Sequence, residues 1–109
     1  MALYTQPLDQ DDLIVLCEDM TFSRRDVVIA NLAIDVNVGD IIKVNGSGLS
    51  TSTDTAFLLV AIPQEAGANK TVTTVDRDCI VRYQMLHATN TAAVTAAMTY
   101  FDTKNIRVL

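Results

Sequence analysis

Residues 36–49, VNVGDIIKVNGSGL, carry the pattern that decides the fold. Branched apolar residues lie on both sides of one Gly-Asp pair, and the stretch then ends in small turn residues. Branched side chains favour strands, whereas Asn and Gly tolerate the positive φ of tight turns. We therefore predict a turn at 38–40, a strand at 41–44 and a hairpin turn at 45–48.

Short apolar runs on either side of this stretch predict the other strands. Residues 56–62, AFLLVAI, are apolar throughout, and a run of this length favours a strand buried on both faces over a helix. Residues 64–70, QEAGANK, have the composition of a loop. Besides the strand at 41–44, we predict strands at 13–19, 26–34, 56–62, 71–75 and 79–86, and a last short strand at 105–109.

Residues 91–103, TAAVTAAMTYFDT, predict the one helix of the chain. Alanine has the highest helix propensity, and the apolar side chains recur at the spacing of one helix face. Thr89 or Asn90 can cap the amino end, and Asn105 suits the left-handed position after the carboxyl end. The expected fold is mainly β, a small barrel or sandwich of about six or seven short strands with one C-terminal α-helix.

Length and composition indicate one globular domain. The chain has 109 residues, half of them apolar, and no apolar run approaches the ~18 residues of a membrane span. Its first residues have neither the basic region nor the apolar core of a signal peptide, so we expect it to stay where it is made, without a membrane partner. We divide it into an extended N-terminal arm at 1–12 and a single β-rich domain at 13–109.

The net charge is concentrated in the first twenty residues. They hold Asp9, Asp11, Asp12, Glu18 and Asp19, and no Lys or Arg. Subtracting these five acids from 13 leaves eight, which balance the eight bases of the remaining chain, so the net charge of -5 belongs to the leader. Because affinity for nucleic acid comes largely from basic groups on phosphates, we expect no nucleic-acid partner. The acidic leader is either solvated or docked on a basic protein surface.

The arm combines polar residues with a few apolar ones. Leu3, Tyr4 and Leu8 lie in it beside Pro7, without a core of their own. Such a segment is either a frayed terminus or an arm that becomes ordered on a partner. Under the second hypothesis, the binding residues are Ala2, Leu3, Tyr4, Thr5, Gln6, Pro7, Leu8, Asp9, Asp11 and Asp12.

Side chains that could perform chemistry are few. His87 is the only histidine, and no serine lies in a nucleophile elbow. Cys17 and Cys79 lie in apolar strand patterns, where a thiol is usually packing, and whether the two form a disulfide is left open. Asp76 and Asp78 supply too few oxygens for a calcium loop, and no zinc motif is present. We expect no catalytic residue, metal, cofactor or small-molecule substrate.

Three segments, in their order along the chain, resemble the lambda-type head decoration proteins of tailed bacteriophages. They are VVIANLAIDVNVGDIIKV at 27–44, AFLLVAIPQEAGANKTVTTVDRDCIVRYQML at 56–86 and TAAVTAAMTYFDTKNIRVL at 91–109. The resemblance covers about residues 26–109 and is one of order and spacing, without an invariant motif. It implies a capsid decoration, or cement, protein that binds the expanded head at local three-fold sites and stabilises the major capsid lattice against DNA pressure.

The same resemblance implies a partner, an assembly and a location. The protein would be made in the cytoplasm of a bacterial host and act on the outer surface of the phage head. It would form a homotrimer, bind the major capsid protein, and add its arm as a strand to a capsid β element. The candidate residues of the subunit interface are Phe57, Leu59, Met98 and Tyr100.

Two alternative functions stay open at this point. One is another virion β module, such as a tail-tube, fibre-base or head-completion protein. The other is a small enzyme or ligand-binding barrel that uses His87 or Cys79 in a polar pocket.

Overall fold

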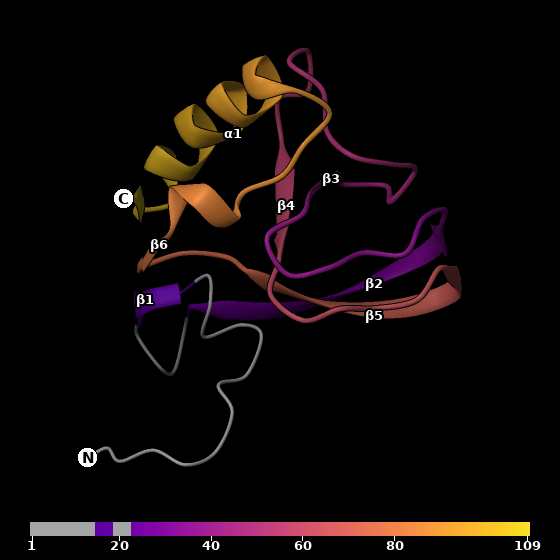
Figure 1. Cartoon of the computed structure of the whole chain (residues 1–109). Coiled ribbons are helices and arrows are strands. Elements are labelled where there is room, and N and C mark those ends of the chain that lie inside the picture. Colours follow the sequence, from indigo (N-terminus) through magenta and orange to yellow (C-terminus); the bar gives the residue numbers. More distant parts are fainter. Residues whose placement is uncertain (1–14, 19–22) are drawn as a thin grey trace.

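The computed structural model describes residues 15–18 and 23–109, and the predicted arm at 1–12 lies outside these residues (Figure 1). The described part is mainly β with one helix near its carboxyl end, which confirms the expected fold class. In chain order, the elements are β1 (Val15–Glu18), β2 (Arg24–Leu32), β3 (Ile41–Lys43), β4 (Phe57–Val60), β5 (Gly67–Val75), β6 (Cys79–Val81), a 3-10 turn (Tyr83–Met85), α1 (Thr91–Thr103) and β7 (Ile106–Val108).

The strands form two sheets. One has three strands in the order β1-β6-β7, with β1 antiparallel and β7 parallel to β6. The other has four strands in the order β2-β5-β4-β3, all antiparallel. The parallel β6–β7 pair is possible because α1 carries the chain back between the two strands, as parallel pairing requires.

β2 and β5 form a long two-stranded ribbon. They pair from Arg24 opposite Val75 to Leu32 opposite Gly67. Only Thr74 and Val75, at the end of β5, also pair with β4. Most of the ribbon therefore extends beyond β4. Figure 1 shows β2 and β5 side by side at the opposite end of the molecule from α1.

β4 is buried on both of its faces, as its uninterrupted apolar sequence predicts. Alternate side chains of a strand point to opposite faces, and all four residues of β4 are buried. Phe57 and Leu59 belong to the helix-side core, and Leu58 and Val60 belong to the ribbon-side core. The helix-side core is Ile41, Phe57, Leu59, Ala61, Val75, Cys79, Val81, Ala88, Ala93, Val94, Ala97, Phe101 and Ile106. The ribbon-side core is Ile29, Leu32, Val36, Ile42, Leu58, Val60 and Val72.

The Gly-Asp turn before β3 is hydrogen-bonded on both sides. On one side, the Gly39 N–H donates to the Val60 carbonyl and the Val60 N–H donates to the Asp40 carbonyl, both at 2.9 Å. On the other side, the His87 N–H donates to the Gly39 carbonyl at 2.9 Å, and the Ile41 N–H donates to the His87 carbonyl at 2.7 Å. The turn therefore joins β4 to the segment between β6 and α1.

Gly39 is required at this turn for two reasons. Its φ is +90°, a conformation that side chains with a Cβ rarely adopt. A Cβ at this position would also lie 1.9 Å from the Met85 carbonyl oxygen, which is backbone and cannot move away alone. The close approach of residues 39 and 85 thus depends on glycine.

The helix matches its sequence prediction at both ends. α1 covers Thr91–Thr103, and the side chain of Asn90 accepts a hydrogen bond from the Ala93 N–H at 2.9 Å. Of the two predicted caps, Asn90 is therefore the one used. Asn105 has a φ of 57°, the left-handed conformation expected just after the helix.

Most predicted strand boundaries differ from the structure by one or two residues, and two differ by more. Residues 67–70 were expected in a loop but begin β5, because pairing with β2 supplies partners along the whole segment and overrides its weak strand propensity. The strand expected at 79–86 ends at Val81, and Tyr83–Met85 form a 3-10 turn. The turn brings the Met85 carbonyl against Gly39, a tertiary contact that the local sequence does not encode.

Replacing Gly39 with alanine tests how much the junction of residues 39–41 with Val60 and His87 contributes to stability. We expect Gly39→Ala to lower the free energy of unfolding by about 1–3 kcal/mol, because alanine is strained at positive φ and meets the Met85 carbonyl. Gly48→Ala is the matched control, since a Cβ there has no neighbour within 4 Å. Denaturant unfolding followed by circular dichroism measures both. Equal stabilities of the two variants would contradict the assignment.

Candidate functional site

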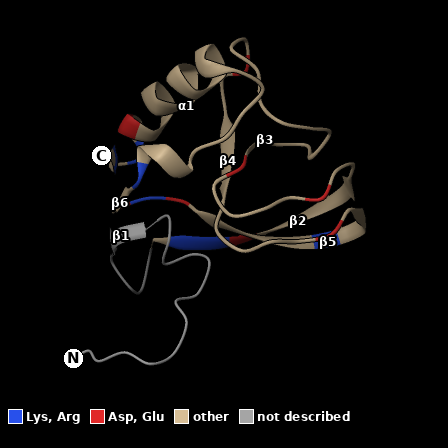
Figure 2. Cartoon of the chain, in the orientation of Figure 1, with Lys and Arg blue, Asp and Glu red and all other residues tan. Residues whose placement is uncertain are grey.

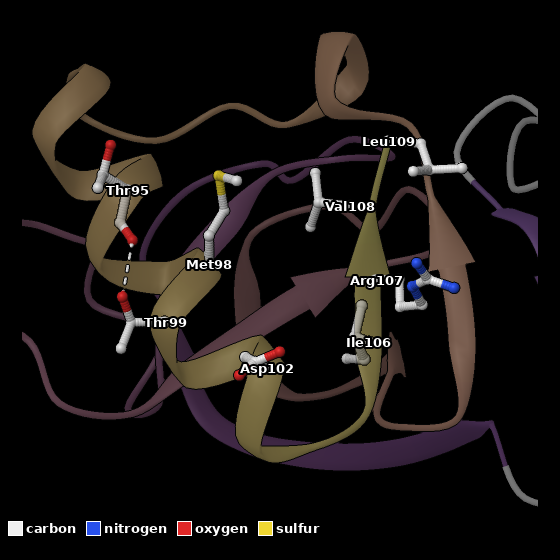
Figure 3. Close-up of a pocket in the computed structure, with 8 residues that line it drawn as sticks. All are labelled: Thr95, Met98, Thr99, Asp102, Ile106, Arg107, Val108 and Leu109. Atoms are coloured by element: carbon white, nitrogen blue, oxygen red, sulfur yellow. Dashed lines mark hydrogen bonds between the residues drawn. The ribbon is translucent and has the colours of Figure 1, made fainter.

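A groove lies between α1 and β7. Its volume is about 530 Å³, and Figure 3 shows side chains of both elements facing it. The floor of the groove is apolar, because it is formed by the buried Ile106 and the half-buried Met98 and Val108. Threonine hydroxyls and two charged side chains make the rim polar. The residues lining the groove are Thr95, Met98, Thr99, Asp102, Ile106, Arg107, Val108 and Leu109.

β7 presents an open backbone edge in this groove. In a parallel ladder, alternate residues of a strand bond to its neighbour. Asn105 accepts from the Cys79 N–H, and Leu109 donates to the Val81 carbonyl, so residues 105, 107 and 109 bond to β6. The N–H and C=O groups of Ile106 and Val108 point away from β6. β7 is the last strand of its sheet, and among the described residues no partner covers this edge.

The outer edge of β3 is covered by the chain itself. The Lys43 N–H donates to the Gly48 carbonyl at 3.0 Å, and the Ser50 N–H donates to the Ile41 carbonyl at 2.9 Å. The loop after β3 thus folds back along the strand. Asp54 fixes this loop, because its carboxylate accepts from the Thr51 N–H at 2.8 Å and from the Lys43 ammonium at 3.1 Å.

The edge of β2 is also protected. Gly46 lies against Ile29, and the Ala33 N–H donates to the Gly46 carbonyl at 2.9 Å, so the β3–β4 loop covers the end of β2. The beginning of β2 carries Arg24, Arg25 and Asp26, and charges on an edge strand discourage pairing with another chain. β7 differs from β2 and β3 because, in the described part of the chain, no segment covers the outward groups of residues 106 and 108, and Arg107 is its one charged residue.

Basic residues gather at the end of the molecule that contains this edge. Six basic and four acidic residues lie in three segments, 24–26, 76–82 and 102–107. The other residues of 23–109 include two basic and four acidic ones. Figure 2 shows most Lys and Arg segments near β1, β6 and the carboxyl end of the chain. The bases of the first group are Arg24, Arg25, Arg77, Arg82, Lys104 and Arg107.

The His87 imidazole contacts the Asp40 carboxylate beside the Gly-Asp turn. Its Nδ1 lies 3.1 Å from Asp40 Oδ1, and Asp40 Oδ2 accepts from the Asn37 N–H at 2.9 Å. The imidazole is 66% exposed and the carboxylate 12% exposed. Among the described residues, no hydroxyl or thiol hydrogen-bonds to the imidazole. This geometry gives His87 a structural role, because its contact with Asp40 reinforces the backbone hydrogen bonds between residues 39–41 and residue 87.

The structure separates the four residues expected at a subunit interface. Phe57 and Leu59 are 4% and 1% exposed, so their side chains stabilise the chain's own core and are not available to a partner. Met98 and Tyr100 are half-buried on α1. Met98 lines the groove, whereas the Tyr100 ring packs on Phe57 with 5.6 Å between centroids and lies under the Lys104 ammonium.

The other sequence candidates do not form a site in the described part of the chain. Cys79 is buried in the helix-side core, and the side chain of Cys17 lies outside the described residues, as do the ten arm residues. The described residues contain no group of three or more His, Cys, Asp or Glu side chains that could hold a metal. They also contain no helix with the length and apolar content needed to cross a membrane.

Sequence reasoning missed the open edge at Ile106 and Val108. The short strand at 105–109 is visible in the sequence, but its parallel pairing with β6 is not. The nearest signal is the helix just before it, since a strand that follows a crossover helix can pair in parallel.

Fold and site together define a small β-rich protein with an open strand edge beside its helix. The chain belongs to the PixA family of inclusion body proteins, whose family model matches residues 5–107. No curated protein and no solved structure matches the chain.

The family match overturns the resemblance to phage head decoration proteins. The chain belongs to another family, so the predicted capsid function, the alternative as another virion module, and the location on a phage head are wrong. The resemblance rested on the order of apolar strands, a turn, a helix and a last strand, which unrelated β-rich domains share. The capsid partner and the trimer were expected because of that resemblance and lose their basis with it.

The loop that covers β3 should respond to pH through Asp54. The Thr51 N–H, and then the Lys43 ammonium, lower the pKa of this carboxyl from its usual value. A carboxyl with a lowered folded-state pKa stabilises the fold above its unfolded pKa of about 3.9, and this contribution is lost as pH falls through the folded-state pKa. We expect Asp54→Asn to be less stable than the native chain at pH 7, with the difference vanishing in strong acid.

Urea unfolding of both proteins between pH 7 and 2 measures this convergence. Asp35→Asn is a suitable control for removing a loop carboxylate, because Asp35 accepts one backbone hydrogen bond, from the Ala66 N–H, and no ion pair is found for it in the described chain. A constant stability difference at every pH would contradict the role of the Asp54 charge.

Proposed function

We propose that this protein is a structural component of inclusion bodies, built by self-association of folded copies. The observation that carries the proposal is the match of the family of inclusion body proteins to residues 5–107. The match spans nearly the whole chain, so it concerns the described domain and not a short shared motif. The partner in this proposal is a second copy of the same chain.

The two cores support an inclusion of folded rather than unfolded molecules. Large apolar side chains such as Phe101, Leu32 and Ile41 are fully buried inside one chain, so they are not free to join copies together. Contacts between copies would have to use the surface. The exposed large apolar residues are Val28, Val44, Ile62, Tyr83 and Leu109, on several different elements.

The charge distribution also supports dense packing. Eight acids balance eight bases after residue 20, so folded domains repel one another little. Near-zero net charge favours association and precipitation. The net charge of -5 comes from the first twenty residues, which can approach the basic end of another copy.

The proposal needs no catalysis, and it retains the expectation that the chain has no cofactor, nucleic-acid partner, membrane partner or small-molecule substrate. The His87–Asp40 pair lies 3.1 Å apart and fits its role in the junction. An enzyme would need a nucleophile or a bound group near the exposed imidazole.

Inclusions formed by the full chain in cells test the proposal. We expect dense bodies that dissolve in a buffer without denaturant and release folded protein, because they consist of native domains. Infrared spectra of the intact bodies should show the helix and strand content of the soluble protein. Gly39→Ala is the control for misfolding: its lower stability populates the unfolded chain more, so we expect a larger share of its deposits to require denaturant than of the native chain's.

Two results would refute the function. The full chain could remain soluble and monomeric at the highest concentration reached in cells. Alternatively, native-chain bodies could dissolve only in denaturant and lack the helix in their infrared spectrum, as ordinary misfolded aggregates do.

A further inference from the structure

We propose that copies join head to tail: the acidic segment before β1 of one copy, residues 1–14, adds as a strand to the open edge of β7 in the next copy. This inference rests on the proposed function and names the contact through which the inclusion grows. The acceptor is the groove between α1 and β7 (Figure 3). The donor is a segment of this chain outside the described residues.

The acceptor has the groups that strand addition requires. The N–H and C=O of Ile106 and of Val108 point away from β6, giving two donors and two acceptors on one edge. An extended segment beside them would continue the sheet in the order β1-β6-β7-donor. Main-chain hydrogen bonds supply affinity in such additions without requiring special side chains.

The groove beside this edge favours an occupant with some apolar side chains. Its floor combines Met98, Ile106 and Val108, and its volume is about 530 Å³. Residues 1–14 contain Leu3, Tyr4 and Leu8 among polar residues. Alternate side chains of an added strand would face the groove and solvent in turn.

Charge favours the acidic segment over pairing of two β7 strands. A two-fold β7 pair centred on Arg107 would place two arginines directly opposite each other, which is unfavourable across strands. The donor instead brings Asp9, Asp11 and Asp12, and no base, to an edge that carries Arg107. Lys104 and Arg82 lie on the segments flanking this sheet, whereas Asp102 on the α1 side of the groove opposes the attraction.

The sheet order makes this contact open-ended. β1 lies at one edge of the three-stranded sheet and β7 at the other, so donor and acceptor belong to opposite edges. An interface between two different surfaces can repeat indefinitely, whereas a two-fold interface closes after two copies. Head-to-tail addition therefore produces growth, as an inclusion requires.

Two full-length variants, each blocking one side of the contact, test the inference. Val108→Pro removes an outward N–H that does not bond to β6, so it blocks the edge and leaves the β6–β7 ladder intact. Val108→Ala is its control, because alanine keeps the N–H. The triple variant Asp9→Lys, Asp11→Lys, Asp12→Lys reverses the donor charge and keeps the acceptor edge. Far-UV circular dichroism checks that all three fold.

Sedimentation velocity over a range of concentrations would measure the self-association of each protein. Val108→Pro and the triple variant should each need a concentration about tenfold or more above the native chain for half-assembly, since a main-chain hydrogen bond or several charge contacts are lost. Val108→Ala should assemble at a concentration much closer to that of the native chain than Val108→Pro does, because it keeps the N–H and shortens only one side chain of the groove floor. Mixed in equal amounts, the two blocked variants should form a 1:1 complex and no larger species, because only one intact donor and one intact acceptor remain.

Thr99→Trp gives a second acceptor variant if Val108→Pro does not fold. Thr99 is exposed at the rim of the groove, so tryptophan fills the groove without entering the core. Thr103→Trp, on the same helix but outside the groove lining, is its control. Weaker assembly of Thr99→Trp alone supports the acceptor, and equal assembly of both tryptophan variants overturns it.

Other results overturn the inference and leave the proposed function standing. Native-like assembly of Val108→Pro would exclude the β7 edge. Dimerisation of the triple variant alone, blocked by Val108→Pro, would indicate two-fold β7 pairing. Mixed variants that stay monomeric would show that donor and acceptor do not meet between copies, as when a segment occupies its own groove. A native chain that forms no inclusions in cells refutes the proposed function itself.

Discussion

The structure depends on the backbone of Gly39, Asp40 and Ile41, which is hydrogen-bonded on both sides. One side bonds to Val60 in β4, and the other to His87 between β6 and α1. These bonds connect segments that are about twenty and nearly fifty residues away in the chain. Glycine permits this because the Met85 carbonyl occupies the space that a Cβ would need. The His87–Asp40 contact adds a side-chain link to the same junction.

The sequence predicts the elements better than it predicts their partners. The helix at 91–103 and the doubly buried strand in 56–62 follow from composition and spacing, and both are confirmed. Local patterns do not contain the long pairing that extends β5 to Gly67, or the contact that ends β6 at Val81. Element order alone also led to the wrong family, because strands, a turn, a helix and a last strand recur in unrelated folds.

The candidate site was less predictable than the fold, because it is a property of strand order. Of the residues expected at a subunit interface, Met98 lines the groove, whereas Phe57 and Leu59 are buried in the chain's own core. The spacing of apolar residues does not distinguish a strand that packs against another subunit from a strand that is buried on both faces within its own chain. The unpaired groups of Ile106 and Val108 become visible only once β7 is known to pair in parallel at the end of its sheet.

The double burial of β4 also limits how its sequence can vary. A strand with one solvent-exposed face accepts polar residues at every second position, but residues 57–60 have no solvent-exposed face. A hydroxyl or amide on either side would meet an apolar core and lack a hydrogen-bond partner. Exchanges in this run are therefore restricted to apolar residues of similar volume, whereas exposed positions of the ribbon such as Val28 accept polar residues as well.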